Sequence, residues 1–260
     1  MSATITFQKD NGVATIALNR PDVFNSFNRE MALAVIAALD DCAADADVRA
    51  IVLTGNGRAF CAGQDLNEAI DPNNGISFEV ILNEHYNPII RRIRSIEKPV
   101  IAAVNGVAAG AGANIAFACD FAVASKKASF TQAFSKIGLV PDSGGTFFLP
   151  RLVGLQRATA LMMLSDKVTA EEAESMGLIY KAIDDTEFAF FVEELANRLA
   201  AMPTKALGMT KRLINAGFNH NLDQQLDMEG ELQVLAGESY DFKEGVNAFL
   251  EKRKAVFKGI

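Results

Sequence analysis

The residue best placed for acid–base chemistry is Asp142, which lies in the segment KIGLVPDSGGT at residues 136–146. Pro141 before it and Gly144-Gly145 after it predict a turn whose backbone can come very close to a ligand, and its upstream neighbours are apolar. A carboxylate in such surroundings can act as a base. The segment alone leaves an equal alternative, that Asp142 merely caps a helix starting near Gly144.

Glycine-bearing turns follow short apolar segments at several points of the chain. Their small side chains would let backbone N–H groups face a ligand, and N–H groups at a helix start carry the positive end of the helix dipole. Two such donors directed at one oxygen would form an oxyanion hole. Any one of these turns is explained more simply by close packing of a helix on a strand. The turns are Ala62-Gly63, Gly110-Ala111-Gly112 and Gly144-Gly145.

Composition and motifs argue against several classes of function. A net charge of −7 and a pI near 5 disfavour a surface that binds nucleic acid. The cysteines form no CxxC pair, and the only histidines are His85 and His220, so we expect no disulfide framework, no metal site and no Ser/His/Asp triad. The phosphate-loop, nucleophile-elbow and dinucleotide-binding patterns are also missing.

The chain carries no signal for export or for membrane insertion. Its first residues lack a basic region followed by an apolar core, and no apolar run has membrane-spanning length. We therefore expect a cytoplasmic protein that binds neither membrane nor nucleic acid.

The elements that must position these turns alternate between strands and helices. Alternating polarity on both sides of Asn11-Gly12 predicts a β-hairpin. Residues 28–42 show a helical period, with Asn28 as the cap. This alternation predicts a largely parallel sheet covered by helices. Further strands are expected at residues 49–54, 100–104 and 120–124, and a mobile loop at 71–75. A long helix is expected at 77–96, interrupted or bent near Pro88. A helix of small residues should follow the run 105–114 and end at Cys119.

From Leu155 onward the pattern changes to helices. The change predicts an α/β core followed by a helical section. The periodicity does not tell whether the sheet is open or spirals upon itself. The expected helices span residues 156–164, 169–176, 187–201, 204–216, 222–236 and 239–249.

Taken together, the chain resembles the crotonase superfamily, the enoyl-CoA hydratases and isomerases, over essentially its whole length. The resemblance implies an α/β spiral of ββα units, a helical C-terminal section used in trimerisation, and a homotrimer or a hexamer built as a dimer of trimers. We expect residues 1–200 to form the spiral core with the CoA and acyl site, and residues 201–260 the helical section. The segments that carry the resemblance are Leu18-Asn19-Arg20-Pro21 with Asn25, AFCAGQDL at 59–66, KPVIAAVNG at 98–106 and GLVPDSGGT at 138–146.

The resemblance also assigns roles at the site. The family's two oxyanion-hole amides fall on the N–H groups of Ala62 and Ala111. The two glutamates that hold water in the hydratases correspond to Asn114 and Phe134, neither of which can abstract a proton. Asp142 stands where several isomerases and a dehalogenase of the family place their acid. A standard hydratase is therefore disfavoured.

The binding site for the CoA ester can be carried over in part. Asp22 departs from the family pattern, because some relatives place a lysine there for the CoA phosphate. Lys258, on this chain or on a neighbouring subunit, is a candidate to replace it. The other substrate-binding positions that the resemblance implies are Phe24, Ser26, Gln64, Asp65, Leu66, Gly112, Asn114 and Phe134.

Four further features in combination suggest one branch of the family: GQDL at 63–66, YNPIIRR at 86–92, FSK at 134–136, and Pro141-Asp142 with Gly144-Gly145. On these, the chain resembles the isomerases that convert the ring-epoxide of phenylacetyl-CoA into its oxepin form in phenylacetate degradation. The resemblance implies no metal and no redox cofactor, since CoA is part of the substrate. A Δ3,Δ2-enoyl-CoA isomerase or an atypical hydratase is the second interpretation. The third is a catalytically silent or nucleic-acid-binding member of the same fold, which the acidic pI disfavours.

Overall fold

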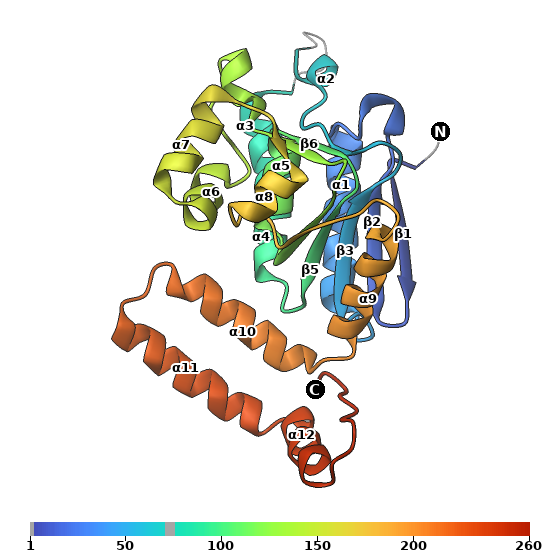
Figure 1. Cartoon of the computed structure of the whole chain (residues 1–260), viewed down its shortest axis with the longest axis vertical. Helices are drawn as coiled ribbons and strands as arrows, with labels where there is room; N and C mark the ends of the chain where they lie inside the picture. The colour runs from blue at the N-terminus through green and yellow to red at the C-terminus, as the bar shows by residue number, and fades with distance from the viewer. Residues whose placement is uncertain (1–2, 71–75) are drawn as a thin grey trace.

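A six-stranded sheet lies at the centre of the computed structural model, which describes residues 3–70 and 76–260 (Figure 1). The strand order is β1-β2-β3-β5-β7-β10, and only the β1–β2 pair is antiparallel. The predicted hairpin and parallel sheet are thus confirmed, while the loop predicted at 71–75 lies outside the described residues. The strands are β1 (Ile5–Asp10), β2 (Val13–Leu18), β3 (Ala50–Gly55), β5 (Val100–Val104), β7 (Phe121–Ser125) and β10 (Lys181–Ile183).

A second sheet, of four short strands in the order β4-β6-β8-β9, packs beside the first. The chain passes from a strand of the first sheet directly into one of the second, from β3 to β4, β5 to β6 and β7 to β8, and so winds as a spiral. The sequence analysis missed these strands because two or three residues are too few to show an alternating period. They are β4 (Ala59–Cys61), β6 (Val107–Ala109), β8 (Ser129–Thr131) and β9 (Val168–Thr169).

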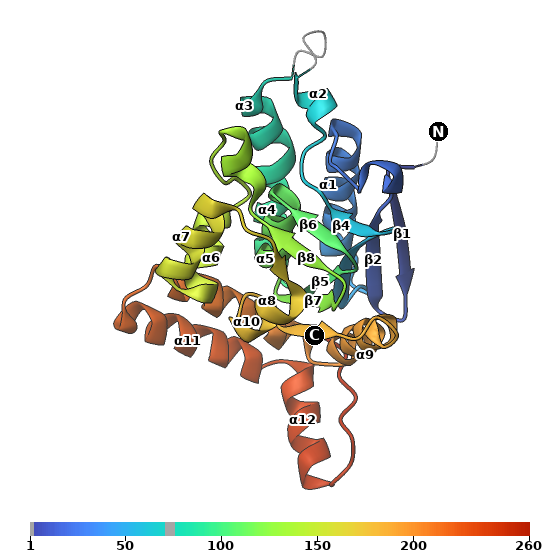
Figure 2. The same ribbon diagram turned by 45° about the horizontal axis from the view of Figure 1, so that its top comes forward.

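Helices cover both faces of the main sheet (Figures 1 and 2). On one face, α1 (Arg29–Ala44), α4 (Asn87–Ser95) and α5 (Ala111–Ala118) enclose the larger hydrophobic core, and on the other α9 (Phe188–Ala200) packs over a smaller one. The predicted cap of α1 is confirmed, because Asn28 Oδ1 accepts a hydrogen bond from the Met31 N–H at 3.0 Å. No helix of the described chain has the length and apolar character needed to cross a membrane.

The helix predicted at residues 77–96 is continuous but changes its winding. It begins as α3 (Phe78–Val80), widens into a π-helical turn, η2 (Ile81–Tyr86), and becomes α4 where Pro88 occupies the first turn. A π turn carries an extra residue per turn and rotates the side chains around it. Here it directs His85 and Tyr86 into the interior, where both are buried.

The remaining helices extend the spiral toward the C-terminus. In Figures 1 and 2, α10 and α11 run side by side below the sheets, and α12 extends away from them. The helices predicted after Leu155 are confirmed to within a few residues. They are α7 (Leu155–Leu164), α8 (Ala170–Ser175), α9, α10 (Thr204–Gly217), α11 (Leu222–Gly237) and α12 (Tyr240–Leu250), and the short strands β9 and β10, which were not predicted, lie among them. The other helices are α6 (Gly145–Val153) and the short α2 (Leu66–Ile70), η1 (Pro21–Val23) and η3 (Ala133–Ile137).

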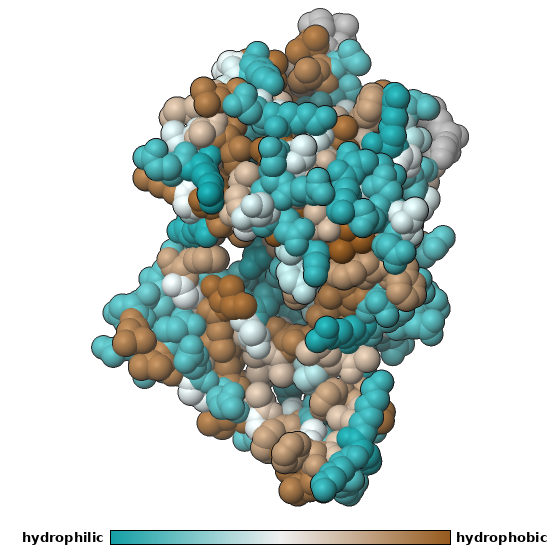
Figure 3. Space-filling view, viewed as in Figure 1, coloured by the Kyte–Doolittle hydropathy of each residue, from teal (hydrophilic) through white to brown (hydrophobic). Residues whose placement is uncertain are grey.

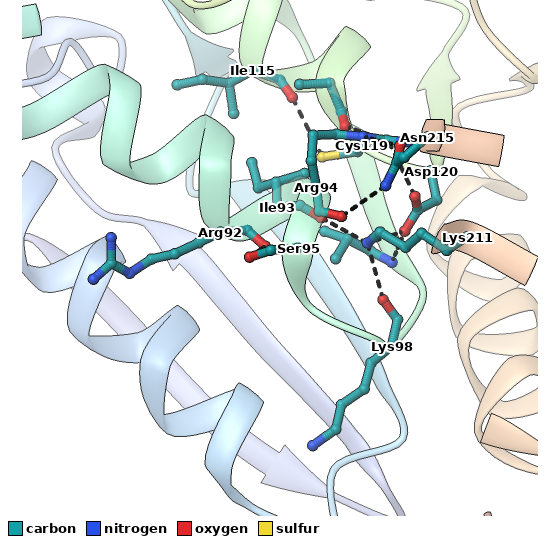
Figure 4. Close-up of polar contacts among 12 residues, drawn as sticks. Arg92, Ile93, Arg94, Ser95, Lys98, Ile115, Cys119, Asp120, Lys211 and Asn215 are labelled. Carbon is teal, nitrogen blue, oxygen red and sulfur yellow. Dashed lines mark hydrogen bonds and ion pairs between the residues drawn. The ribbon is translucent and has the colours of Figure 1, made fainter. Parts of the chain in front are cut away.

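A buried lysine fastens α10 to the core (Figure 4). Lys211 Nζ donates to the Ile93 carbonyl at 2.6 Å and to Asp120 Oδ2 at 2.7 Å. Asp120 Oδ1 also accepts from Arg94 at 3.1 Å. Burial lowers the pKa of Lys211, and the aspartate offsets part of that effect. Beside this network Figure 3 shows a hollow between α10 and the body of the molecule, an apolar cleft of about 400 Å³.

Candidate active site

Two glycine-bearing turns lie in direct contact at one end of the second sheet. They follow β4 and β6, which are parallel neighbours, so their carboxyl ends meet at the same edge. A Cβ atom on Gly112 would lie 2.4 Å from the Cys61 carbonyl oxygen, and one on Gly63 would lie 3.1 Å from that of Ala109. Only glycine allows the two backbones to approach this closely. Gly112 thus has a packing role that brings the two turns together, and its contact with a ligand stays a prediction.

The first turn presents a different N–H group from the one predicted. The Ala62 N–H donates to the Phe24 carbonyl at 3.0 Å, so the assignment of Ala62 to the oxyanion hole is wrong. The Gly63 carbonyl accepts from the Phe27 N–H at 2.7 Å. In a trans peptide the N–H lies opposite the C=O, so the Gln64 N–H points away from Phe27. Among the described residues, none accepts a hydrogen bond from it.

The second turn presents the N–H of Ala111, the first residue of α5. The Gly110 carbonyl accepts from the Asn114 N–H at 3.1 Å, within the first helical turn, so the Ala111 N–H points out of the helix start with the positive end of the dipole. A Cβ on Gly63 would lie 3.7 Å from the Ala111 nitrogen. The two outward N–H groups, of Gln64 and Ala111, thus stand beside one another.

The turn that carries Asp142 is fastened to the same helix. Asn114 Nδ2 donates to the Asp142 carbonyl at 2.9 Å, and Asn114 Oδ1 accepts from Gln132 Nε2 at 2.7 Å. Asn114 is fully buried and lies one turn after Ala111 in α5. Since both ends of its amide are bonded within the protein, Asn114 positions the Asp142 turn, and the prediction that it contacts substrate is corrected.

The Asp142 carboxyl is a partly buried acid. Burial raises its pKa to about 6, against the opposing hydrogen bond that Ser143 Oγ donates at 2.9 Å. The capping alternative is wrong, because α6 begins after Gly144 without a side-chain cap. The apolar neighbour Val140 does not cause this burial, since its side chain is 81% exposed.

Phe134 is buried beside the second glycine-bearing turn, as expected for a residue at the substrate site. Its ring would lie 3.7 Å from a Cβ on Gly110, at the start of the second turn. Both positions that correspond to the hydratase glutamates are therefore occupied here by side chains that cannot take a proton.

Phe24 and Ser26 lie in the loop at residues 20–27, called the 20s loop below, which borders the first turn. Phe24 adopts a left-handed conformation with φ +54°, and the Arg58 guanidinium stacks 4.1 Å from the centre of its ring. Ser26 Oγ donates to the Val23 carbonyl at 2.7 Å. Leu66 is half exposed beside them. This arrangement leaves an aromatic face and a guanidinium at the rim of the site.

Asp65 and Lys258 do not contribute to the site as predicted. The Asp65 carboxylate pairs with Arg20 at 2.9 Å and accepts from the Asn67 N–H at 3.1 Å, so it holds the loop together. Lys258 lies on the C-terminal tail, where its ammonium is 4.4 Å from the centre of the Tyr240 ring. The C-terminal tail contacts Arg49, just before the first residue of β3, whereas the glycine-bearing turns lie beyond the last residue of β3. Within one chain, Lys258 is therefore not brought to Asp142.

Tyr86 is a site residue to which the sequence analysis gave no role. Its hydroxyl donates to Gln64 Oε1 at 2.9 Å, and the Gln64 amide donates in turn to Glu68 Oε2 at 3.1 Å. The π turn that rotates Tyr86 inward leaves no mark in the hydrophobic period of the sequence. The only available signal was an aromatic residue two positions before Pro88.

Comparison with known proteins shows the family to which the chain belongs. The family described as "Enoyl-CoA hydratase/isomerase" matches residues 8–260. The chain is 46% identical to the "1,2-epoxyphenylacetyl-CoA isomerase" of Escherichia coli, over 96% of each chain. It is also 46% identical to a "Probable enoyl-CoA hydratase" of Rhodobacter capsulatus, over 98% of each. The crystal structure of a "putative enoyl-CoA hydratase from Streptomyces coelicolor" superposes with a TM-score of 0.93, at 37% identity, covering 99% of this chain and 94% of that one.

The spiral of ββα units and its paired backbone amides define a crotonase-fold enzyme. The chain belongs to the enoyl-CoA hydratase/isomerase family.

Proposed function

We propose that this enzyme is an acyl-CoA isomerase that converts the ring-epoxide of phenylacetyl-CoA into its oxepin form. The observation that carries the proposal is the partly buried carboxyl of Asp142, on a turn whose main chain is bonded to Asn114, one helical turn after Ala111. The similarity to the Escherichia coli isomerase supports the choice of acyl group.

In the proposed mechanism the N–H groups of Gln64 and Ala111 donate to the thioester oxygen. Their hydrogen bonds strengthen as negative charge develops on that oxygen, and each such donor contributes about 3 kcal/mol to lowering the barrier. The carbon next to the carbonyl becomes acidic as a result. These steps need neither a metal nor a redox cofactor, and CoA enters as part of the substrate.

Asp142 then moves the proton. Its carboxylate takes a proton from the carbon next to the thioester, and the electron pair passes into the enolate. The C–C bond shared by the epoxide and the six-membered ring breaks while both C–O bonds remain, which expands the ring to the seven-membered oxepin. The same carboxyl returns the proton to a ring carbon, so that substrate and product are isomers. A pKa of about 6 suits both steps, because the group is charged at neutral pH and holds the proton only weakly.

A Δ3,Δ2-enoyl-CoA isomerase is the second candidate, because it needs the same proton transfer between two carbons. A hydratase is a weaker candidate, although the Rhodobacter capsulatus relative carries that name. Hydration requires groups that hold and deprotonate water, and Asn114 and Phe134 cannot abstract a proton.

We further propose that the chain works as a homotrimer or a hexamer. Several apolar side chains of α11 and α12 are more than half exposed in the single chain and would be covered by a neighbouring subunit. In such an assembly, Lys258 of one subunit could meet the CoA phosphates of another, which a single chain does not allow. The side chains are Leu222, Leu226, Val234, Phe242, Phe249 and Leu250.

The test is turnover of two substrates. The purified enzyme is incubated with enzymatically generated ring-epoxide of phenylacetyl-CoA and, separately, with 3-hexenoyl-CoA, and products are followed by chromatography and absorbance. We expect fast conversion of the epoxide and its loss in Asp142→Asn, with CoA-ester binding retained. Conversion of the hexenoyl ester alone would favour the second candidate, and an active Asp142→Asn variant would refute the role of Asp142.

A further inference from the structure

The side chain of Gln64 is held at both ends by residues outside its own turn. Its Oε1 accepts from the Tyr86 hydroxyl at 2.9 Å, and its Nε2 donates to Glu68 Oε2 at 3.1 Å. The opposite orientation of the amide would set its oxygen against the carboxylate, so these partners allow one orientation only. Glu68 is fixed in turn, because its two oxygens accept from the Arg29 N–H at the start of α1 at 3.0 and 3.1 Å.

From this arrangement we propose that Tyr86 is a positioning residue for the oxyanion hole, acting through Gln64. The inference rests on the proposed function in one respect, that the Gln64 N–H receives the thioester oxygen. Tyr86 itself makes no contact with substrate in this proposal.

The backbone at this point needs such a support. The peptide that carries the Gln64 N–H begins at Gly63, whose φ of +96° lies in a region open mainly to glycine. A glycine gives the peptide plane freedom to rotate, and rotation would turn the N–H away from the site. The bond from the Phe27 N–H to the Gly63 carbonyl resists this rotation on one side, and the fixed Gln64 side chain resists it on the other.

Tyr86 is well suited to this task. It is almost fully buried, and its ring meets the edge of the Phe27 ring with centroids 5.7 Å apart. Phe27 is the residue whose backbone bonds both the Gly63 carbonyl and the Asp65 N–H. Burial raises the pKa of Tyr86 well above its usual value, so the hydroxyl remains a proton donor at any pH the enzyme meets. One side chain thus braces the turn through both its ring and its hydroxyl.

The experiment compares Tyr86→Phe, Gln64→Leu and the double variant. Tyr86→Phe keeps the ring packing and removes only the bond to Gln64. We expect kcat to fall about tenfold while KM changes less than about twofold, because the lost interaction matters most when charge develops on the oxygen. If Tyr86 acts through Gln64, the double variant should be no slower than Gln64→Leu alone, whereas independent residues would give multiplied losses.

A spectroscopic measurement separates positioning from a merely structural role. Bound 4-(dimethylamino)cinnamoyl-CoA absorbs at longer wavelength when its thioester carbonyl is hydrogen bonded. We expect a clear shift with the parent enzyme and a smaller one with Tyr86→Phe. Tyr180→Phe, which changes a half-exposed tyrosine packed on Phe121, is the matched control and should keep the full shift.

The outcomes are distinguishable. Unchanged kcat and an unchanged absorbance shift in Tyr86→Phe would overturn the proposal, as would lower thermal stability with a full shift. Multiplied losses in the double variant would also overturn it. The absorbance shift is measured without turnover. If the parent enzyme does not convert the epoxide, the proposed substrate is refuted, while the absorbance shift can still show whether the oxyanion hole depends on Tyr86.

Discussion

The side-chain amide of Asn114 donates a 2.9 Å hydrogen bond to the main-chain carbonyl of Asp142. Asn114 lies one helical turn after Ala111, so a single rigid helix, α5, carries both the proposed oxyanion donor and the support of the proposed acid. Asn114, which the family resemblance matches to a catalytic glutamate of the hydratases, is here a structural support. The chemistry proposed for Asp142 depends on this change of role.

Asn114→Asp should therefore impair the enzyme although it adds a carboxylate to the site. The new oxygen would face the Asp142 carbonyl where an N–H donor is needed, leaving a buried acceptor unpaired at a cost of about 1–3 kcal/mol. We expect kcat to fall at least about tenfold as the acid loses its position. The measurement is steady-state turnover together with urea unfolding. Asn219→Asp, at an exposed site after α10, is the control, and parent-like activity in Asn114→Asp would contradict the argument.

The pH dependence of kcat/KM should report the Asp142 carboxyl. Since its pKa is raised to about 6 and the proposed base is the charged form, the rate should rise with pH below about 6 and level off above it. A pH–rate profile between pH 4.5 and 8 on the best substrate would measure this. A limb centred near 4, the ordinary value of an aspartate, would show that the rate-determining group is not the buried Asp142.

The same pKa predicts that Asp142 destabilises the fold at neutral pH. The folded protein binds the proton more tightly than the unfolded chain, so stability falls as pH rises from about 4 to about 6 and then stays constant. The pKa of Asp142 is higher by roughly two in the folded protein than in the unfolded chain, which corresponds to about 3 kcal/mol of stability. Asp142→Asn should thus be more stable than the parent at pH 8 by up to this amount and nearly equal to it at pH 3.5. Denaturant unfolding at the two pH values tests this, and an equal difference at both would exclude the linkage.

Gly112→Ala should separate the two turns that form the site. An added Cβ would lie 2.4 Å from the Cys61 carbonyl oxygen and 2.7 Å from its sulfur, and both belong to a strand that cannot move aside easily. We expect at least about a hundredfold loss of kcat/KM, because small misplacements of catalytic groups are costly. Gly230→Ala in α11, which meets no atom within 4 Å, is the matched control and should slightly stabilise the protein. Near-parent turnover in Gly112→Ala would show that the contact between the turns is not needed.

Local signals in the sequence were enough to predict much of the fold and the acid. The hairpin follows from alternation around Asn11-Gly12, which take φ +49° and +80°, and the start of α1 follows from the Asn28 cap. Each depends on residues only a few positions apart. A base at Asp142 could be anticipated as well from the turn that Pro141 and Gly144-Gly145 predict, although its apolar neighbour Val140 is exposed and does not bury it.

The tertiary structure decided which groups face the site. Ala62 and Gln64 are two residues apart in one turn, and only the partner strand and the 20s loop determine that the Ala62 N–H is consumed and the Gln64 N–H is not. The support that Asn114 gives Asp142 spans 28 positions, and that of Tyr86 on Gln64 spans 22. Hydrogen-bond partners so distant in sequence leave no periodic pattern, since they meet only after the chain has closed its spiral.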